Sequence, residues 1–443
     1  MDNAWIKRKL FWLQDWVSGT GMWNHYRDVR RIMLHPEESQ PDLDRRLNDM
    51  LQYARKNVRY YSNVGGGALC DFPVVDKNTF RGDYDAFVVG RKEGYVVHHT
   101  SGSTGTPFNA YQDKDSNVRR IATIKAANEE FGFHSCMPMF FLRSLEVPDE
   151  EGRMLRYEKA QNIWYGYIAS YDDAAFADVV QFIFDRHIRF VKGYASIIER
   201  LTEYVDRKGI ALPRGLVFVT ISEILTGNVR SRIVDKLGLH VVSQYANEEN
   251  GLLGQSVLDG PGMVFRLNRA NCKIELLGLD NDEPVGIGQP GRVVVTDLTN
   301  RAMPMIRYDI GDVAVCLEAL PNGEPLVIRL MDCRHIDMIY DTSGHPVPMV
   351  VPSQILTIPS LRQLQFIQVD VKEYILNLNV GSGSRNIDCG QMAQYIKDLL
   401  GQDATVDVRI LDEMPQTSAR KHKLCIQKCS RYYPSIVAVD ADN

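Results

Sequence analysis

A run of small, hydroxyl-bearing and turn-forming residues at positions 100–107 is the first feature of this sequence that could carry chemistry. It consists of Thr100, Ser101, Gly102, Ser103, Thr104, Gly105, Thr106 and Pro107. Gly102 and Gly105 permit backbone conformations that turn successive N–H groups toward one anion, and the hydroxyl groups add further donors. The run is therefore a candidate phosphate-binding loop. A flexible surface connector rich in serine and glycine is the alternative that its composition leaves open.

Four further sites along the chain carry polar side chains of the kind that a nucleotide-handling enzyme needs. They are Glu223, the run Tyr245-Ala246-Asn247-Glu248-Glu249, the run Arg307-Tyr308-Asp309-Ile310-Gly311-Asp312, and Lys421. None is decisive alone, because each type of residue also has an ordinary structural role. These alternatives are core packing for Tyr245, a solvated acidic pair for Glu248 and Glu249, a turn for Asp312 and a solvated base for Lys421.

The middle of the chain alternates short apolar runs with amphipathic stretches. Strands are predicted at residues 188–191, 216–221 and 240–243, and helices between them at residues 196–208 and 229–237. Repeated units of this kind predict a parallel sheet with helices on its faces, whose ligands bind at the carboxyl ends of the strands. Residues 245–249 directly follow the last of these strands, so we expect them at the ligand-binding edge.

A further strand at residues 292–297 leads to a polar loop at 307–312, and the organisation changes beyond residue 334. There the pattern predicts strands at 364–371, 373–380 and 405–410 and a helix at 391–400. We therefore predict an α/β chain with two domains. The large N-terminal domain, residues 1–333, is built on a parallel sheet, and residues 334–443 form a small, mobile α+β domain.

Two amphipathic helices are predicted before this core. Residues 42–58 place apolar side chains at helical spacing, with Asp42 as the capping residue. Residues 5–17 combine several large apolar side chains with a short basic cluster, a pattern that suits either a packed helix or one that rests on a membrane. We expect packing, because apolar stripes in soluble proteins mostly face their own core.

The overall composition is that of a compact globular protein. With 51 basic and 56 acidic residues the net charge is -5, which offers no basic footprint for nucleic acid. The eight cysteines form neither a CxxC pair nor a dense framework, a usage typical of reduced thiols in the cytosol. No stretch approaches the roughly 18 apolar residues of a membrane span, so we expect a cytoplasmic protein without stable membrane insertion.

Taken in this order, the motifs resemble those of the adenylate-forming enzymes, the superfamily of acyl-CoA synthetases, phenylacetate-CoA ligases and adenylation domains. The serine-threonine-glycine loop, the tyrosine-to-glutamate motif at 245–249 and the tyrosine-to-aspartate motif match the order and spacing of that family. Residues 193–196 and 300–308 are similar to the branch of phenylacetate-CoA ligases and their CapK-like relatives from capsular polysaccharide clusters. The resemblance extends from about residue 53 to residue 428.

The resemblance implies that a carboxylic acid attacks the α-phosphorus of ATP, so that pyrophosphate leaves and an acyl adenylate forms, and that coenzyme A then takes the acyl group. Since this chemistry needs no covalent help, the protein would position the reactants and stabilise charge. The implied roles are phosphate binding for residues 100–106, nucleotide binding for Glu223, adenine stacking for Tyr245, Mg²⁺ binding for Glu249, ribose binding for Asp312, a ribose or phosphate contact for Arg334, and charge neutralisation for Lys421.

Several positions differ from the family pattern, namely Thr106, Ala246, Glu248, Asp309, Ile310, Cys333, Ile336 and Arg420. Thr106 stands where a lysine is common, so the loop lacks one positive contact to pyrophosphate. Glu248 adds a negative charge beside the expected metal. Arg334 matches the start of the family's hinge motif, and rotation of the small domain about that hinge normally reshapes the site between the two half-reactions. The changes on either side of Arg334 therefore bear on the second half-reaction more than on the first.

Tyr165 and Tyr194, together with Trp164 and Tyr167, are candidates for an aromatic lining of the acid pocket, with core packing as their alternative. An aromatic or arylacetic acid would suit such a lining, as would other acids. Two other functions stay open: an adenylate-forming ligase that makes an amide in polysaccharide or natural-product biosynthesis, and a degenerate nucleotide-binding protein without catalysis. The expected partners are a small carboxylic acid, ATP with Mg²⁺, and CoA or an amine acceptor. A homodimer is compatible with the sequence.

Overall fold

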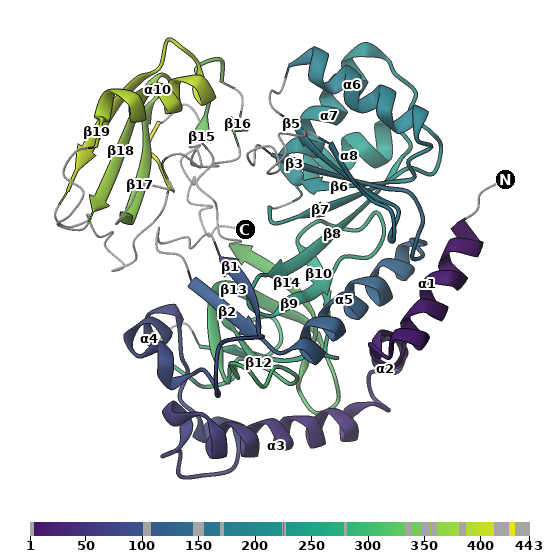
Figure 1. The fold of residues 1–443 in the computed structure, drawn as a ribbon, viewed down its shortest axis with the longest axis vertical. Helices are drawn as coiled ribbons and strands as arrows, with labels where there is room; N and C mark the ends of the chain where they lie inside the picture. Colours follow the sequence, from purple (N-terminus) through teal and green to yellow (C-terminus); the bar gives the residue numbers. More distant parts are fainter. Residues whose placement is uncertain are drawn as a thin grey trace, which may run out of the picture. The chain divides into compact units, whose positions relative to one another are not determined.

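The structure is a computed structural model that describes residues 4–100, 108–144, 155–168, 172–223, 225, 227–278, 281–332, 339–344, 346–347, 355, 361–380, 387–411 and 425–429. Its contacts divide the chain into two compact units, a large one that ends at residue 333 and a small one formed mainly by the residues after it (Figure 1). The predicted domain boundary lies beside residues 333–338, which are outside the described residues.

The large unit begins with helical elements: α1 (Ala4–Ser18), α2 (Met22–Leu34), α3 (Gln40–Asn57), η1 (Arg59–Tyr61), η2 (Leu69–Asp71), α4 (Lys77–Gly82) and η3 (Tyr84–Ala86). The helix predicted at residues 42–58 is confirmed as α3, which starts two residues earlier, so that Asp42 lies in its first turn instead of capping it. Its buried stripe contains Leu43, Met50, Leu51 and Ala54. The apolar period therefore identified the helix, while its first turn was missed.

Helix α1 forms as predicted, but most of its apolar side chains do not pack against the protein. The exposed ones are Trp5, Ile6, Leu10, Leu13, Trp16 and Val17. The other side of the helix packs through Trp12, whose ring lies 4.8 Å from that of Trp23, and through polar contacts: Arg8 pairs with Glu129 at 2.8 Å, and the buried Asp15 accepts a hydrogen bond from the backbone of Trp23 at 2.9 Å. The expectation of a packed apolar stripe is therefore wrong for this face of α1. Among the described residues, no helix is long and apolar enough to span a membrane.

A sheet of twelve described strands forms the centre of the large unit. Its order is β11-β12-β13-β14-β10-β9-β8-β7-β6-β3-β5-β4. The strands are β3 (Met139–Ser144), β4 (Leu155–Glu158), β5 (Ile163–Ile168), β6 (Phe190–Tyr194), β7 (Val217–Ile221), β8 (His240–Asn247), β9 (Gly251–Gln255), β10 (Val264–Leu267), β11 (Cys272–Leu277), β12 (Pro290–Asp297), β13 (Tyr308–Ala319) and β14 (Pro325–Asp332). Before them, β1 (Val96–Thr100) and β2 (Phe108–Gln112) form a separate two-stranded sheet on either side of residues 101–107.

Strands β3, β6, β7 and β8 are parallel, which confirms the predicted parallel sheet and α/β class. The helices of this part are α5 (Lys114–Asn128), α6 (Asp173–Asp185), α7 (Ala195–Lys208) and α8 (Gly227–Ser231), with the short turns η4 (Glu129–Phe131) and η5 (Arg232–Lys236). Val191, Phe218 and Val241 pack in one cluster with residues of α6 and α7. Their neighbours Phe190, Val219 and Val242 pack in another with Phe131 and Phe133. Both faces of the sheet are thus covered (Figure 1).

Two predicted boundaries are wrong near the motifs. Strand β8 was expected to end at residue 243 but runs to Asn247, so Tyr245 lies inside it. Residues 308–312 were expected in a loop and instead begin β13, where Tyr308, Ile310 and Asp312 are buried in alternation. Gly311 has a left-handed backbone, with φ of 86°, so the extended conformation is broken at this position near the start of β13.

The small unit contains the elements predicted for the C-terminal region. They are β17 (Leu361–Asp370), β18 (Glu373–Val380), α10 (Cys389–Leu400), β19 (Thr405–Ile410) and β20 (Cys425–Gln427), preceded by the two-residue strands β15 (Ile339–Tyr340) and β16 (Pro346–Val347). The sheet order is β19-β18-β17-β20, with β17 and β18 antiparallel as predicted. Phe366, Leu376, Leu378, Ile396 and Leu400 belong to its apolar core. The small unit therefore has a core of its own between α10 and the sheet.

Candidate functional site

The structure describes part of the predicted site. Residues 101–106, Arg334 and Lys421 lie outside the described residues, so their predicted roles are carried forward as predictions. The described candidates are Thr100, for which only the backbone is described, and Glu223, Tyr245, Glu249, Asp312, Tyr165 and Tyr194. All of these belong to the large unit except Thr100, which the division of the chain assigns to the small one.

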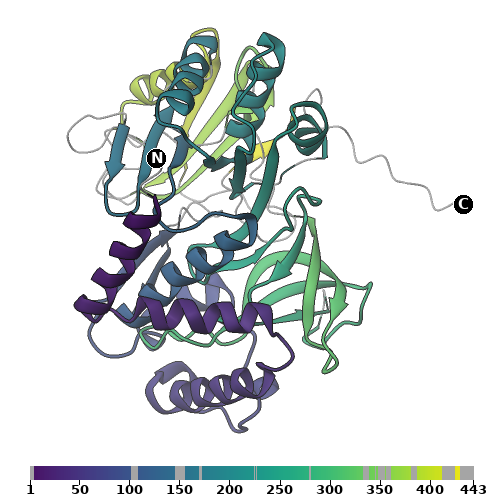
Figure 2. The same cartoon turned by 90° about the vertical axis from the view of Figure 1, so that its right-hand side faces the viewer.

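The second and third motifs meet at a buried hydrogen bond. Tyr245 Oη donates to Asp312 Oδ2 at 2.7 Å, and both side chains are buried. In the sheet order, three strands separate β8 from β13, so the antiparallel strands must curl for these side chains to meet (Figure 2). The Tyr245 ring also lies 5.4 Å from the ring of Phe265 in β10. The structure thus brings together two residues that the sequence predicted for the same nucleotide.

Glu249 is a buried carboxylate at the turn between β8 and β9. Asn247 Oδ1 accepts a hydrogen bond from the Asn250 backbone at 2.6 Å, and Gly251 has φ of 77°, so this Asn and Gly pair shapes the turn. Lys77 Nζ lies 2.6 Å from Glu249 Oε1, and Tyr308 Oη donates to the same oxygen at 3.2 Å. The carboxylate is therefore held by a cation from α4 and a phenol from β13.

Lys77 is a site residue that the sequence reasoning missed. It is the first residue of α4, where the Asp76 carboxylate caps the helix by accepting a hydrogen bond from the Thr79 backbone at 2.8 Å. The side chain is only 12% exposed and reaches a carboxylate far away in the sequence. The capping pattern could have predicted the start of the helix, but no local pattern predicts this ion pair.

Glu248, which departs from the family pattern, is paired outside the buried cluster. Its side chain is 57% exposed and lies 3.1 Å from Arg120 Nη2, while Arg120 Nη1 donates to the Glu248 carbonyl at 2.6 Å. His98 Nδ1 lies 3.8 Å from the same carboxylate. Burial, and secondarily the nearby Arg120, lowers the pKa of His98. The extra negative charge of Glu248 is therefore offset by Arg120.

The other polar residues of the third motif have structural partners. Arg307 is buried, donates to the Phe72 carbonyl at 3.1 Å and lies 3.4 Å from the Glu275 carboxylate. Asp309 accepts a hydrogen bond from Arg292 at 2.7 Å. These contacts hold the start of β13, which carries Tyr308 and Asp312. Arg307 and Asp309 therefore support the strand, while Tyr308 and Asp312 belong to the candidate site.

Glu223 lies at the carboxyl edge of the parallel strands. It follows β7, and its backbone N–H donates to the Ile221 carbonyl at 2.8 Å across Ser222, which has a left-handed φ of 64°. Ile221 pairs with Gln244 in β8, the residue before Tyr245. The sheet register therefore brings Glu223 to the same edge as the second motif, as the strand alternation predicted.

Tyr165 and Tyr194 have different surroundings in the described part of the chain. Tyr165 Oη donates to Glu158 at 3.2 Å, and its ring lies 5.7 Å from that of Phe141. Tyr194 packs against the apolar cluster of α6 and α7, as does Trp164. Core packing, the alternative left open by the sequence, therefore describes the contacts of Tyr194 and Trp164.

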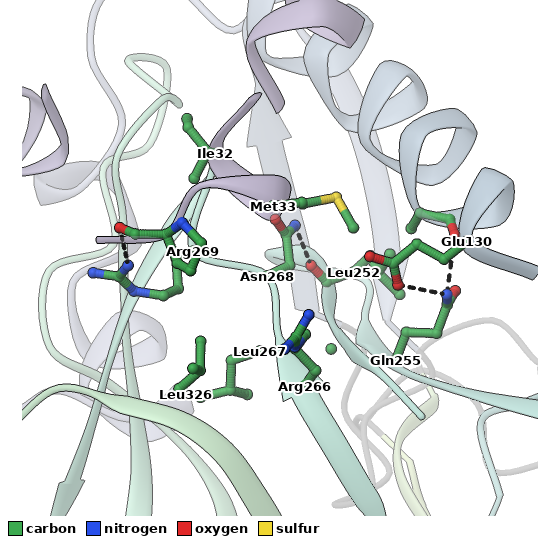
Figure 3. Close-up of a pocket in the computed structure, with 13 residues that line it drawn as sticks. Ile32, Met33, Glu130, Leu252, Gln255, Arg266, Leu267, Asn268, Arg269 and Leu326 are labelled. Atoms are coloured by element: carbon green, nitrogen blue, oxygen red, sulfur yellow. Dashed lines mark hydrogen bonds between the residues drawn. The ribbon is translucent and has the colours of Figure 1, made fainter. Parts of the chain in front are cut away.

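A hollow in the large unit is lined by other residues (Figure 3). Its lining includes Ile32, Met33, Glu130, Leu252, Gln255, Arg266, Leu267, Asn268, Arg269 and Leu326. Gln255 Nε2 donates to the Ala127 carbonyl at 3.0 Å and lies 3.4 Å from Glu130 at its edge. None of the described site residues lines this hollow, so it is distinct from the predicted nucleotide site.

The donor set at Glu249 fits magnesium only in combination with phosphate. Among the described residues there is no group of three or more His, Cys, Asp or Glu side chains that could hold a metal ion. Mg²⁺ is usually held by one or two carboxylates together with substrate phosphates and water, and a single buried carboxylate meets that need. The described residues therefore fit a metal that arrives with a nucleotide.

The fold is that of the adenylate-forming CoA ligases. A solved structure of 2-hydroxyisobutyryl-CoA ligase with 2-HIB-AMP and CoA, in the thioesterification state, is similar with a TM-score of 0.55 and 17% identity, over 89% of this chain and 91% of that one. An open conformation of the same ligase has a TM-score of 0.50 and 18% identity, over 85% and 89% of the two chains. These structures confirm the predicted fold.

Sequence comparison narrows the resemblance to one branch. Protein CapK of Staphylococcus aureus is 21% identical over 446 residues, which cover 95% of each chain. Phenylacetate-coenzyme A ligase of Pseudomonas putida is 21% identical over 455 residues, or 90% of this chain and 97% of that protein. No family model matches the chain. The predicted resemblance to the phenylacetate-CoA ligase and CapK branch is confirmed.

Proposed function

We propose that this protein is an ATP-dependent carboxylate ligase that forms an acyl adenylate with release of pyrophosphate and then transfers the acyl group to coenzyme A. The observation that carries the proposal is the meeting of Tyr245 and Asp312 in one buried hydrogen bond, with Glu249 held beside the same strands by Lys77 and Tyr308. The two CoA ligases among its relatives support the same reaction.

In this proposal β8 and β13 together hold the nucleoside. The Tyr245 ring stacks on adenine, and the Asp312 carboxylate accepts hydrogen bonds from the ribose hydroxyl groups, because a carboxylate is an acceptor that faces two donors. The 2.7 Å hydrogen bond from Tyr245 orients Asp312 before ATP arrives. Because the carboxylate is already oriented, less conformational entropy is lost when ATP binds.

Glu249 is the proposed protein ligand of Mg²⁺. Bound Mg²⁺ would offset the charge of the phosphates and polarise the α-phosphate. Lys77 and Tyr308 both contact Oε1, so they fix the plane of the carboxylate. Lys77 also limits the cost of burying that negative charge in the absence of a nucleotide. It is therefore a positioning residue in this proposal.

The remaining roles are proposed from the motifs. Residues 100–106 hold the β and γ phosphates, Arg334 contacts ribose or phosphate, and Lys421 neutralises charge on the carboxylate and α-phosphate. In this scheme the large domain, residues 1–333, binds ATP and the acid, and the small domain, residues 334–443, supplies Lys421. An aromatic or arylacetic acid, a cytoplasmic location and a homodimer remain predictions.

The differences around Arg334 and before Lys421 bear on the transfer to CoA, so a second candidate is a ligase in which an amine takes the acyl group from the adenylate, AMP leaves and an amide is formed. Similarity to CapK over 95% of both chains is compatible with it. Both candidates share the first half-reaction, so the same adenylation assay tests them together. Adding CoA or amines to the preformed adenylate then separates them.

The experiment measures pyrophosphate release from MgATP across a panel of carboxylic acids, with hydroxylamine to trap the adenylate. Glu249→Gln should lower the adenylation rate by about 100-fold, the usual effect of losing a group that stabilises charge in a transition state. Glu248→Gln is the matched control, because it makes the same change at the preceding residue, whose carboxylate is paired with Arg120. Its adenylation rate should stay within about threefold of the wild-type rate. Equal losses in both variants would argue against the role given to Glu249.

A further inference from the structure

Lys192, in the middle of β6, is a partly buried lysine that the proposed reaction does not use. Its Nζ donates to Gln244 Oε1 at 3.0 Å and lies 5.6 Å from the centroid of the Phe141 ring. Among the described residues, no carboxylate lies within ion-pair distance of this ammonium. Burial lowers the pKa of Lys192 to about 8. The residue as a whole is partly exposed.

The neighbours of Lys192 hold Gln244 in one orientation. Gln244 Nε2 donates to Asn128 Oδ1 and to Gln255 Oε1, both at 2.9 Å. Its amide nitrogen is therefore committed, and the carbonyl oxygen must point to Lys192. The chain of hydrogen bonds reaches an acidic group, Glu130, only beyond Gln255. The ammonium is thus fixed in place by neutral groups.

An aromatic surface continues from Lys192 across the sheet. Phe141 in β3 pairs directly with Lys192 in the parallel register, and the Phe141 ring lies 5.7 Å from that of Tyr165 in β5. Tyr165 is the residue that the sequence predicted for the acid pocket. Gln244 directly precedes Tyr245, which is proposed to stack on adenine. The cation of Lys192 and the two aromatic rings therefore lie on neighbouring strands, and the strand that carries Gln244 also carries Tyr245.

A buried ammonium normally has an acidic partner, because leaving a charge in a low-dielectric environment is costly. An ammonium has three donors, and among the described residues Lys192 uses one of them on a neutral oxygen. A ligand carboxylate would supply both the missing charge and the missing acceptors. A neutral substrate would leave the ammonium unpaired and would gain nothing from it.

We propose that Lys192 recognises a second carboxylate on the acid that is activated, so that the substrate class is a dicarboxylic acid with an apolar or aromatic body lying over Phe141 and Tyr165. This inference rests on the proposed ligase function and deepens it. One carboxylate becomes the acyl adenylate, and the other remains ionised and pairs with Lys192.

The test uses pairs of acids that differ at one end only, such as 4-carboxyphenylacetate with its ring carboxamide, terephthalate with terephthalamate, and adipate with adipamate. Pyrophosphate release from MgATP gives kcat/KM for each member of a pair. The wild type should prefer at least one dicarboxylate over its monoamide by about tenfold or more, the value of one well-placed charged hydrogen bond. The difference should lie mainly in KM, because the distal contact is the same in the ground and transition states.

Lys192→Met keeps an unbranched side chain, one atom shorter, and removes its charge, and it should bring that ratio close to one. Lys125→Met is the matched control, because Lys125 is also a buried lysine with a neutral partner, Gln161 at 2.9 Å, but it contacts the ring of Phe11 on α1. The control should keep the wild-type ratio. The preference of the wild type for dicarboxylates is measured without any variant, so it tests the proposal even where Lys192→Met does not fold.

The outcomes separate the two proposals. Release of pyrophosphate that is equal for both members of every pair, or a preference that Lys192→Met retains, overturns the role of Lys192 and leaves the ligase function standing. No release with any acid overturns the ligase function and this inference with it. A dicarboxylate preference that Lys192→Met abolishes and Lys125→Met keeps supports both.

Discussion

Replacing Lys77 tests whether the buried ion pair with Glu249 is a real energetic unit. Lys77→Met leaves the carboxylate buried with Tyr308 as its described donor at Oε1. The two side chains are only 12% and 4% exposed, so solvent screens their interaction weakly. Breaking such a pair by removing one partner costs about 3–5 kcal/mol. We therefore expect each single variant, Lys77→Met and Glu249→Gln, to lose about 3 kcal/mol of unfolding free energy.

The double variant Lys77→Met/Glu249→Gln leaves no unpaired charge, so its loss should fall short of the sum of the single losses by about 2–3 kcal/mol. The assay is urea unfolding followed by tryptophan fluorescence. The exposed pair Lys92 and Asp85, at 2.5 Å but with side chains 42% and 74% exposed, serves as the control. Its coupling should be much weaker, because solvent screens an exposed pair. Additive losses at Lys77 and Glu249, within about 0.5 kcal/mol, would refute the reasoning.

Three further predictions concern the nucleotide and Lys192. Thr106→Lys restores a positive contact to pyrophosphate and should tighten ATP binding several-fold by calorimetry, a gain of about 1 kcal/mol; unchanged or weaker affinity would contradict the assignment of the loop. Tyr245→Phe removes the donor to Asp312 and should weaken ATP binding by roughly tenfold, while Phe keeps the stacking ring. Lys192→Met should raise the unfolding free energy by about 1–3 kcal/mol at pH 7. The pKa of Lys192 is about 8 in the folded state and 10.5 in the unfolded state, so the unfolding free energy of the wild type rises between pH 8 and pH 10.5. The difference in unfolding free energy between Lys192→Met and the wild type should therefore shrink over this range. A difference that stays constant would contradict the burial of this charge.

The parallel core was predictable because its signal is local. The alternation of apolar runs with helical stripes located β6, β7, β8 and α7: the strands are short runs buried on both faces, and the helix buries one face. The start of β13 was missed because its buried positions, Tyr308, Ile310 and Asp312, are separated by the charged Asp309 and by Gly311. A period of two was present there, but too few of its members were apolar to outweigh the polar residues.

The surroundings of α1 and of Lys77 could not be predicted from local patterns. A helical stripe indicates which side chains share a face, as on α1, but not whether another element covers that face. The pair of Lys77 and Glu249 joins α4 to the turn after β8, and only the tertiary fold determines that contact. The resemblance of the motifs, by contrast, predicted that Tyr245 and Asp312 serve one ligand; the structure places the two side chains in a hydrogen bond, and their roles stay predictions.

The most direct test of the proposed function is acid-dependent pyrophosphate release by the full chain, measured with MgATP, a broad acid panel that includes dicarboxylates, and hydroxylamine as the trap. The proposal predicts release and hydroxamate formation with at least one acid, and a loss of about 100-fold or more in Lys421→Ala under the same conditions. Tight ATP binding without pyrophosphate release for any acid would contradict it and would favour a nucleotide-binding protein without catalysis.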